Sequence, residues 1–218
     1  TSVCVRRQVK HPTRAYVAYV TEGGTLVVKY ADLVSVEFSK LQWITVETIA
    51  GCTACAVPLD GFFRLVPRNR VEFLTDETPW LFYVTAAGAL MGGLLGGTYE
   101  VLVGANVTAL DAIRGEASYH KDEDQGLLLF YIINGGVYYR QLIAGVWGGQ
   151  STVTLAPANA VKIKAERVFD WRIVLQVTEA GGALYEIFAK MQASGWNGTE
   201  FLQFSVSGSG QMFDIYYY

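Results

Sequence analysis

The chain has 218 residues, enough for one large β domain or two small ones. Its composition, 51% hydrophobic and 13% aromatic, can supply a sizeable core, which excludes disorder as the general state. A net charge of −3 with 17% charged residues excludes the basic surface that nucleic-acid binding requires. The sequence starts at Thr1 without a recognisable signal peptide, so we expect a processed chain, an excised fragment or the ordered part of something larger.

Four segments share one pattern, in which a β-rich run, a Gly-containing turn and a second β-rich run follow one another. In chain order they are RAYVAYVTEGGTLVVKY (14–30), WLFYVTAAGALMGG (80–93), LLLFYIINGGVYYRQ (127–141) and WRIVLQVTEAGGALYEIF (171–188). Asn134-Gly135-Gly136 is the strongest turn signal among them, because tight hairpin turns need a positive φ at their central residues. The sequence therefore predicts four β-hairpins.

The second of these segments lies in an uncharged stretch, TPWLFYVTAAGALMGGLLGGTY (78–99), which is long enough to span a bilayer as a helix. Its Pro-Trp start, its β-rich first half and its many Gly and Ala residues fit a hairpin better. Its alignment with three segments that cannot span a membrane also favours a hairpin. We expect no membrane span.

The hairpins recur at a nearly regular interval. The turn glycines Gly24, Gly88, Gly136 and Gly182 are spaced by 64, 48 and 46 residues, and the last two spacings match the period of a four-stranded propeller blade. A short polar turn precedes each hairpin, and AGVWGGQSTVTL (144–155) and ASGWNGTEFLQF (193–204) follow the last two. Strands such as AVKIKAERV (160–168) come before the polar turns. The repeat is therefore a four-stranded antiparallel meander.

The fold that we predict is an all-β β-propeller of four-stranded antiparallel blades, with four evident repeats. Neighbouring blades cover both faces of a propeller sheet, which explains why Leu127 to Ile133 is apolar on both sides. A β-sandwich is the alternative, although it covers only one face of each sheet and needs no repeat. Five blades, or part of a larger ring, fit the pattern as well.

The blade boundaries follow from the same repeat. We predict one propeller domain over residues 1–218, with blades at about 1–48, 68–108, 109–156 and 157–206 and an insertion at about 49–67. The end, QMFDIYYY (211–218), reads as a further strand that could close the ring with the N-terminal strand.

Cys52-Thr-Ala-Cys55 is a CxxC motif within the predicted insertion. A structural zinc site needs four ligands, and Cys4 and His11 could complete one only if the fold brought them close. The favoured interpretation is a pair of half-buried small residues, free or bridged. We expect no metal and no cofactor.

The sequence gives little support for a catalytic site. The carboxylates of Asp76-Glu77 and of the KDED run (121–124) fall in the same turn of successive repeats, where solvated turns are favoured over calcium binding or glycoside hydrolysis. Two histidines, His11 and His120, and no GxSxG elbow give little support to a nucleophilic triad. We predict no catalytic residues, while a propeller glycosidase acting on polysaccharide remains the rival.

Trp147 and Trp196 occupy the same point of two repeats and are the candidate ligand-binding residues, together with Asn197. A tryptophan at a repeated turn is often a packing residue. The functional interpretation is a stacking platform for a sugar, with Asn197 and turn amides donating hydrogen bonds.

GLLLFYIINGGVYYRQLIAGVWGG and ERVFDWRIVLQVTEAGGALYEIFAKMQASGWNGTEF together resemble propeller blades of tailed-bacteriophage tail-fibre or baseplate-associated proteins, which bind receptors. The shared features are the aromatic strand, the Asn-Gly turn, the Tyr-Tyr-Arg strand and the Gly-Trp turn, over about residues 117–205. The resemblance implies a virion or otherwise extracellular protein, usually a homotrimer in a fibre, that attaches to a host cell-wall or surface glycan.

The sequence thus predicts a non-enzymatic binding or structural module of a phage tail that recognises host carbohydrate. A free-standing propeller lectin is a further alternative, which predicts the same ligand residues in every blade. Trp147 and Trp196 have no clear counterparts in the first two repeats, which favours one or two sites over a symmetric ring.

Overall fold

The computed structural model describes residues 3–7, 14–32, 42–58, 79–116, 125–143, 145–153, 155–168, 172–192, 195–196 and 202–206. All the regular elements in these ranges are β-strands. The described residues include no helix that is long and apolar enough to cross a membrane. The chain divides into two compact units, Thr1–Asn106 (unit 1) and Val107–Tyr218 (unit 2), and each is described by itself.

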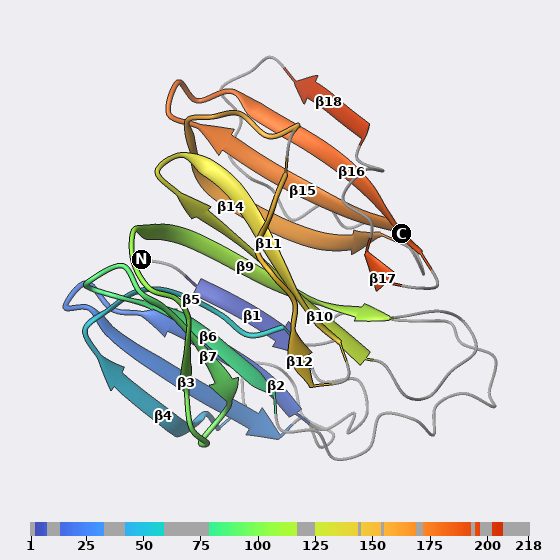
Figure 1. The fold of residues 1–218 in the computed structure, drawn as a ribbon. Helices are drawn as coiled ribbons and strands as arrows, with labels where there is room; N and C mark the ends of the chain where they lie inside the picture. The colour runs from blue at the N-terminus through green and yellow to red at the C-terminus, as the bar shows by residue number, and fades with distance from the viewer. Residues whose placement is uncertain are drawn as a thin grey trace, which may run out of the picture. The chain divides into compact units, whose positions relative to one another are not determined.

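Unit 1 contains two antiparallel four-stranded sheets, each a meander in chain order (Figure 1). The strands of the first sheet are β1 (Val3–Arg7), β2 (Arg14–Val20), β3 (Thr25–Asp32) and β4 (Ile44–Ala50). Those of the second are β5 (Cys52–Ala56), β6 (Trp80–Thr85), β7 (Leu90–Leu94) and β8 (Glu100–Val103). The candidate membrane segment is therefore the hairpin of β6 and β7.

Unit 2 repeats this arrangement, with the outer strand of each sheet divided into two short strands. The third sheet consists of β9 (Val107–Glu116), β10 (Gln125–Ile133), β11 (Gly136–Ile143), β12 (Val146–Trp147) and β13 (Ser151–Thr152). The fourth consists of β14 (Ala160–Val168), β15 (Arg172–Glu179), β16 (Leu184–Gln192), β17 (Gly195–Trp196) and β18 (Leu202–Val206). Both β12 and β13 pair with β11, as β17 and β18 pair with β16.

The four predicted hairpins are present, and their turns use the residues that the sequence indicated. In the hairpin of β10 and β11, Asn134 and Gly135 have φ values of 49° and 81°, so both central residues are left-handed, as in a type I′ turn. Gly24, Gly88 and Gly182 take positive φ in the other three turns. In the third hairpin turn the glycine with positive φ is Gly135, whereas the repeat interval was measured from its neighbour Gly136.

Three of the middle strands, β6, β10 and β15, are buried on both faces, as their apolar sequence predicted, whereas β2, β3 and β11 alternate between buried and half-buried residues. No residue from Leu127 to Ile132 is more than 3% exposed, and Leu81 to Val84 and Ile173 to Val177 are buried as well. The outer strand β4 is instead mostly exposed. Burial on both faces distinguishes these sheets from those of a sandwich, which keep one face in water.

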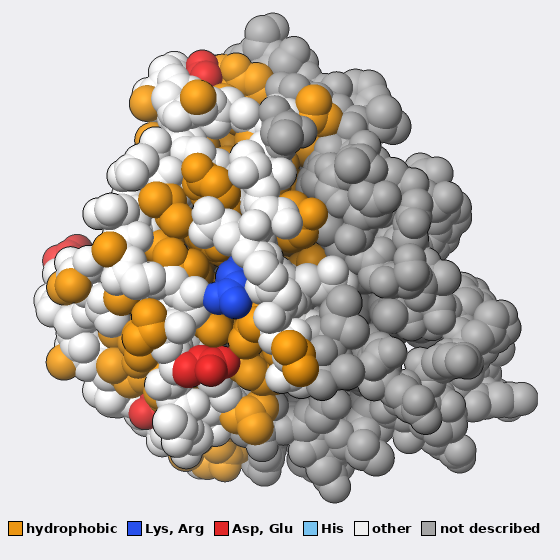
Figure 2. Space-filling model, viewed as in Figure 1, with side chains coloured by type: hydrophobic (Ala, Val, Ile, Leu, Met, Phe, Trp, Pro, Cys, Tyr) orange, Lys and Arg blue, Asp and Glu red, His pale blue; other side chains and the backbone are white. Residues whose placement is uncertain are grey.

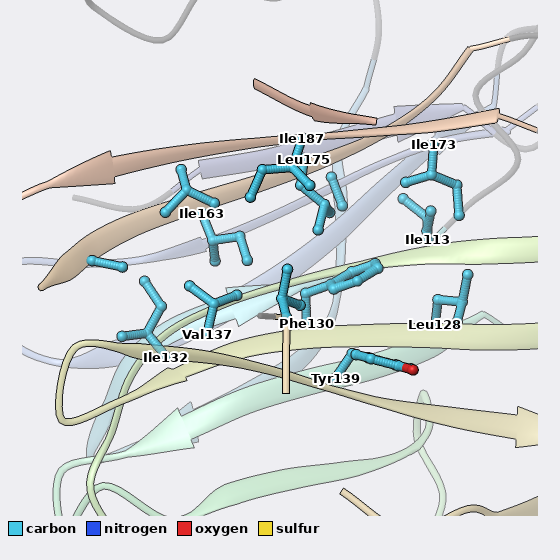
Figure 3. Close-up of a cluster of buried hydrophobic side chains, with 14 residues drawn as sticks. Ile113, Leu128, Phe130, Ile132, Val137, Tyr139, Ile163, Ile173, Leu175 and Ile187 are labelled. Atoms are coloured by element: carbon cyan, nitrogen blue, oxygen red, sulfur yellow. The ribbon is translucent and has the colours of Figure 1, made fainter. Parts of the chain in front are cut away.

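Each unit has a core between its two sheets. In unit 1 the core contains Leu26 and Val28 of the first sheet and Leu81 and Tyr83 of the second. Figure 3 shows the core of unit 2, where side chains of the third sheet point toward those of the fourth. Phe130 lies near its centre, among Ile132, Val137, Leu175 and Ile187.

Polar contacts also join the two sheets of unit 2. Asp111 of β9 is buried, and its Oδ1 and Oδ2 each accept a backbone hydrogen bond over 2.8 Å, from Ala112 N and Ala165 N respectively. Because β14 is the edge strand of its sheet as the structure describes it, Ala165 N faces no further strand of that sheet. At the first residue of β14, Ala160 N donates a hydrogen bond to Gly135 O over 2.9 Å. Asp111 therefore fastens the third sheet to the edge of the fourth.

The prediction of an insertion at 49–67 is wrong for the first half of that range. Residues 52–56 form β5, which pairs with β6 as the first strand of the second sheet. A register shift between Cys52 and Ala54 lets Cys52 and Cys55 both reach the unit 1 core. The predicted strands at 33–38, 71–74 and 211–218 lie outside the described residues, and the organisation of 1–218 as one domain stays a prediction.

Candidate functional site

Trp147 lies in the short strand β12, which folds back on β11 by pairing Trp147 with Leu142. Gly148 N donates to Gln141 O over 2.8 Å and closes the turn. The Arg140 guanidinium lies over the indole, with Cζ 5.8 Å from the ring centroid, and Arg140 Nε donates to Gly148 O over 2.9 Å. Arg140 therefore stabilises the turn that carries Trp147, and the indole is half-buried.

Two tyrosines and an amide lie on the same sheet. The rings of Tyr131 and Tyr138 stack across β10 and β11 with centroids 6.2 Å apart. The Tyr131 hydroxyl donates to Gln150 Oε1 over 3.0 Å, and Gln150 itself is exposed. Burial raises the pKa of Tyr131 to about 12, although the Arg140 charge opposes the shift.

The ionisation of Tyr131 gives a testable pH dependence. Its pKa rises from an ordinary value of 10.0 to about 12 on folding, so the neutral hydroxyl favours the folded state. This contribution is complete below the unfolded pKa and is lost as pH rises through the folded pKa. We expect the free energy of unfolding to decrease as the pH rises from 10.0 to about 12. This decrease should be less steep in Tyr131→Phe.

Urea denaturation at a series of alkaline pH values, followed by circular dichroism, measures this slope. Tyr138→Phe removes a neighbouring hydroxyl and is the control. Equal slopes in Tyr131→Phe and the wild type would contradict the assignment.

The other predicted site residues are only partly described. Trp196 lies in β17, which pairs with Met191 of β16 as Trp147 pairs with Leu142 of β11. The two tryptophans therefore occupy equivalent backbone positions in two sheets, as the repeat predicted. Asn197 lies outside the described residues. The structure places Trp147 and Trp196 on different sheets.

A polar row crosses the fourth sheet on the face opposite to the unit 2 core. Lys164, Gln176 and Glu186 are register partners on β14, β15 and β16, so their side chains share this face. Thr178 lies two residues along β15 on the same face, and Glu166 lies two residues along β14. We call these five residues the polar row: Lys164, Glu166, Gln176, Thr178 and Glu186.

Part of the polar row is already paired. Lys164 Nζ lies 2.9 Å from Glu166 Oε1, and these two side chains are 18% and 23% exposed. Gln176 Nε2 donates to Glu186 Oε1 over 3.4 Å. The row therefore runs from partly exposed charged groups to Gln176, which is 3% exposed.

Two acceptors in the polar row have no partner among the described residues. Gln176 Oε1 and Thr178 Oγ1 are both buried, and neither makes a hydrogen bond. An unsatisfied buried polar group costs about 1–3 kcal/mol, so native structures rarely keep one without a reason. The sequence contains a signal for this site, because Gln176 and Thr178 interrupt an otherwise apolar middle strand.

The CxxC motif has no sign of a metal site. Cys52 and Cys55 are buried thiols, so the alternative of a bridge between them is wrong. Burial raises the pKa of the Cys52 thiol, whose Sγ lies 3.6 Å from Ile49 O. Among the residues that the structure describes, no three His, Cys, Asp or Glu side chains cluster as metal ligands. His11, His120 and both acidic turns lie outside the described residues.

Several solved structures have a similar fold. They include the BP39L lectin of Burkholderia pseudomallei (TM-score 0.59, 16% identity) and AofleA of Arthrobotrys oligospora (0.60, 10%). A third is the Aleuria aurantia lectin (0.52, 11%), a fungal lectin described by its six-bladed β-propeller fold and fucose recognition mode. This chain has the β-propeller fold.

The alignments cover 95%, 95% and 93% of this chain, but only 56%, 57% and 58% of the three solved chains. The chain thus spans less than two thirds of their length. No protein-family model and no curated protein matches the sequence. At these identities the likeness establishes the fold alone.

Proposed function

We propose that the chain is a non-enzymatic carbohydrate-binding propeller and that the polar row of the fourth sheet contacts the sugar. The observation that carries this proposal is the pair of buried acceptors, Gln176 Oε1 and Thr178 Oγ1, that make no hydrogen bond within the described residues. The lectin folds add support, since Aleuria aurantia lectin has a structure in complex with Fucα1-6GlcNAc.

The polar row has the chemistry that a sugar requires. Sugar hydroxyls both donate and accept, so one ring can donate to Gln176 Oε1 and accept from the Thr178 hydroxyl or the Lys164 ammonium. Glu186, whose Oε1 accepts from Gln176, holds the amide so that its oxygen stays oriented. A ligand that supplies the missing donor recovers the cost of the unsatisfied group, which makes binding specific for a hydroxyl at that place.

A glycosidase is the rival from another class. Retaining and inverting glycosidases both need two carboxyl groups across the scissile bond, one of them as a proton donor. Glu166 and Glu186 share the face of the fourth sheet, but Lys164 already forms an ion pair with Glu166. Because Glu166 Oε1 is engaged by the Lys164 ammonium, this carboxyl group suits a binding role better than work on a scissile bond.

The biological setting of this propeller is a separate proposal. The bacteriophage-tail resemblance supports a virion receptor-binding protein that attaches to a host surface glycan, while the lectin folds suit a free-standing extracellular lectin equally well. Sedimentation analysis distinguishes the two assemblies, because a fibre protein is expected to form a homotrimer.

A glycan and cell-wall binding screen with a hydrolysis readout tests the function, with Gln176→Leu as the informative variant. We expect Gln176→Leu to lose binding at least tenfold and to keep its thermal stability, since removing the unsatisfied Oε1 offsets the loss of the long bond from Nε2 to Glu186. Gln141→Leu, the same change on the third sheet, should bind like the wild type. Trp147→Ala and Trp196→Ala test the two predicted stacking platforms.

Three results would count against the proposal. Sugar release in the hydrolysis readout would favour the glycosidase. Undiminished binding by Gln176→Leu would exclude the polar row. Equal loss in Gln176→Leu and Gln141→Leu would show a general effect on folding.

A further inference from the structure

Lys162 of β14 carries a positive charge beside the polar row. Ile163 and Ala165 lie in the unit 2 core, so the alternation of the strand turns Lys162 and Lys164 to the opposite face, where the polar row lies. Lys162 is exposed, and it forms no ion pair with any residue that the structure describes. Its ammonium is therefore accessible to a ligand that contacts this face of the fourth sheet.

The strand register places Lys162 directly opposite Thr178. Side chains of directly paired residues lie about 5 Å apart at Cβ, whereas diagonal neighbours lie about 7–8 Å apart. A register shift between Ala160 and Lys162 accommodates Val161 as an extra residue, so Ala160 stays in the core while Lys162 stays on the polar face. Of the charged residues on this face, Lys162 is therefore the one paired with the unsatisfied Thr178 Oγ1.

The other charges near Thr178 are farther away or on the other face. Lys164 and Glu186 are its diagonal neighbours on β14 and β16, and their opposite charges largely offset each other. Glu179 follows Thr178 in the sequence, but it belongs to the core face, where its Oε2 accepts a hydrogen bond from the Tyr185 hydroxyl over 3.2 Å. The local charge at this end of the polar row is therefore positive.

This local charge differs in sign from that of the whole chain. The net charge is −3 and only 17% of the residues are charged. Figure 2 shows this scarcity in its view, where few charged side chains lie on the described surface among hydrophobic and other ones. General electrostatic attraction therefore does not favour an anionic ligand, and any preference for one must arise from a nearby cation.

We propose that the sugar site prefers a ligand with an acidic group, a carboxylate or a sulfate ester, and that Lys162 determines this preference. The inference rests on the proposed function, in which sugar hydroxyls contact Gln176 Oε1 and Thr178 Oγ1. A ring held at these two atoms lies beside Lys162, so an acidic substituent can reach the ammonium. Either acid suits a lysine, because its ammonium is a compact charge without a fixed planar geometry. An amino sugar is disfavoured, since its own ammonium would face Lys162.

Surface plasmon resonance with the immobilised whole chain tests this proposal. The probes are matched methyl glycosides of glucose, galactose and mannose, each as the neutral sugar, the uronic acid and the 6-sulfate. We expect an acidic member to bind about fivefold more tightly than its neutral counterpart, which is the effect of one exposed ion pair, and this preference should shrink as salt rises. Comparison of the two acids distinguishes a carboxylate ligand from a sulfate ester.

Lys162→Gln should abolish the preference and leave binding of the neutral sugar unchanged, and Lys162→Glu should reverse it. Lys29→Gln, the same change on β3 of the first sheet, is the control and should keep the preference. Equal binding of neutral and acidic sugars by the wild type, or a preference that persists in Lys162→Gln, would overturn this inference and leave the proposed function intact. No binding of any probe would overturn the proposed function, and this inference with it.

Discussion

Replacing Asp111 with alanine should lower the free energy of unfolding by about 3 kcal/mol. The substitution leaves two backbone N–H groups, those of Ala112 and Ala165, without the acceptor that each has at 2.8 Å. Both belong to buried residues, so water cannot replace the carboxylate without local opening. Each buried donor that loses its partner costs about 1–3 kcal/mol, and the removed atoms leave a cavity beside the core.

The effect should depend on acceptor oxygens and not only on volume. Asp111→Asn keeps the shape and one acceptor, so we expect it to cost about half as much as the alanine substitution. Thr108→Ala, at an exposed position of the same strand, should change the free energy of unfolding by less than about 0.5 kcal/mol. Urea denaturation of the four proteins measures these differences. If Asp111→Ala and Thr108→Ala cost the same, the carboxylate does not fasten the two sheets.

Gly135→Ala should also destabilise the protein by about 3 kcal/mol, for two separable reasons. Gly135 has a φ of 81°, a conformation that costs an L-residue about 1–2 kcal/mol. A Cβ at this position would lie 2.5 Å from Ala158 O, so the backbone that leads into β14 must move. That movement strains the bond from Ala160 N to Gly135 O, which joins the third and fourth sheets.

Two other glycines separate these contributions. Gly145 has a φ of 78°, but a Cβ added there would meet no described atom within 4 Å, so Gly145→Ala should cost only the backbone term, about 1 kcal/mol. Gly149 also has open space and carries no such φ, so Gly149→Ala should be nearly neutral. Thermal unfolding of the three variants gives the order. A cost for Gly135→Ala no larger than that for Gly145→Ala would remove the steric argument.

The hairpins and the burial of strand β10 on both faces could be predicted because their signals are local. Asn134-Gly135 specifies its turn through backbone preference alone, and the run from Leu127 to Ile132 is apolar on both faces. These signals do not depend on what the chain does elsewhere. The propeller followed from their repetition at blade-like spacing.

The first strand of the second sheet could not be predicted in the same way. Residues 52–56, CTACA, contain small side chains and no β-branched aliphatic residue, so they gave no strand signal. The register shift beside Cys52 also breaks the alternation that would have marked the strand. Pairing with β6 and burial against the first sheet override this weak local preference.

The polar row could be predicted only in part, from Gln176 and Thr178, which interrupt the apolar strand β15. On β14, Lys164 and Glu166 alternate with Ile163 and Ala165, a pattern typical of a strand with one face in water. Only the register with Gln176 and Glu186 reveals that these side chains join a buried amide on one face. The repeated tryptophans indicate a site at the turns, whereas the unsatisfied acceptors lie within a strand.

The most direct test of a sugar site on the polar row is a crystal structure of the chain with the glycan that binds most tightly in the screen. Our account predicts a sugar hydroxyl within about 3 Å of Gln176 Oε1 and a second near Thr178 Oγ1. A glycan bound only at the Trp147 turn, with water alone at Gln176, would contradict it.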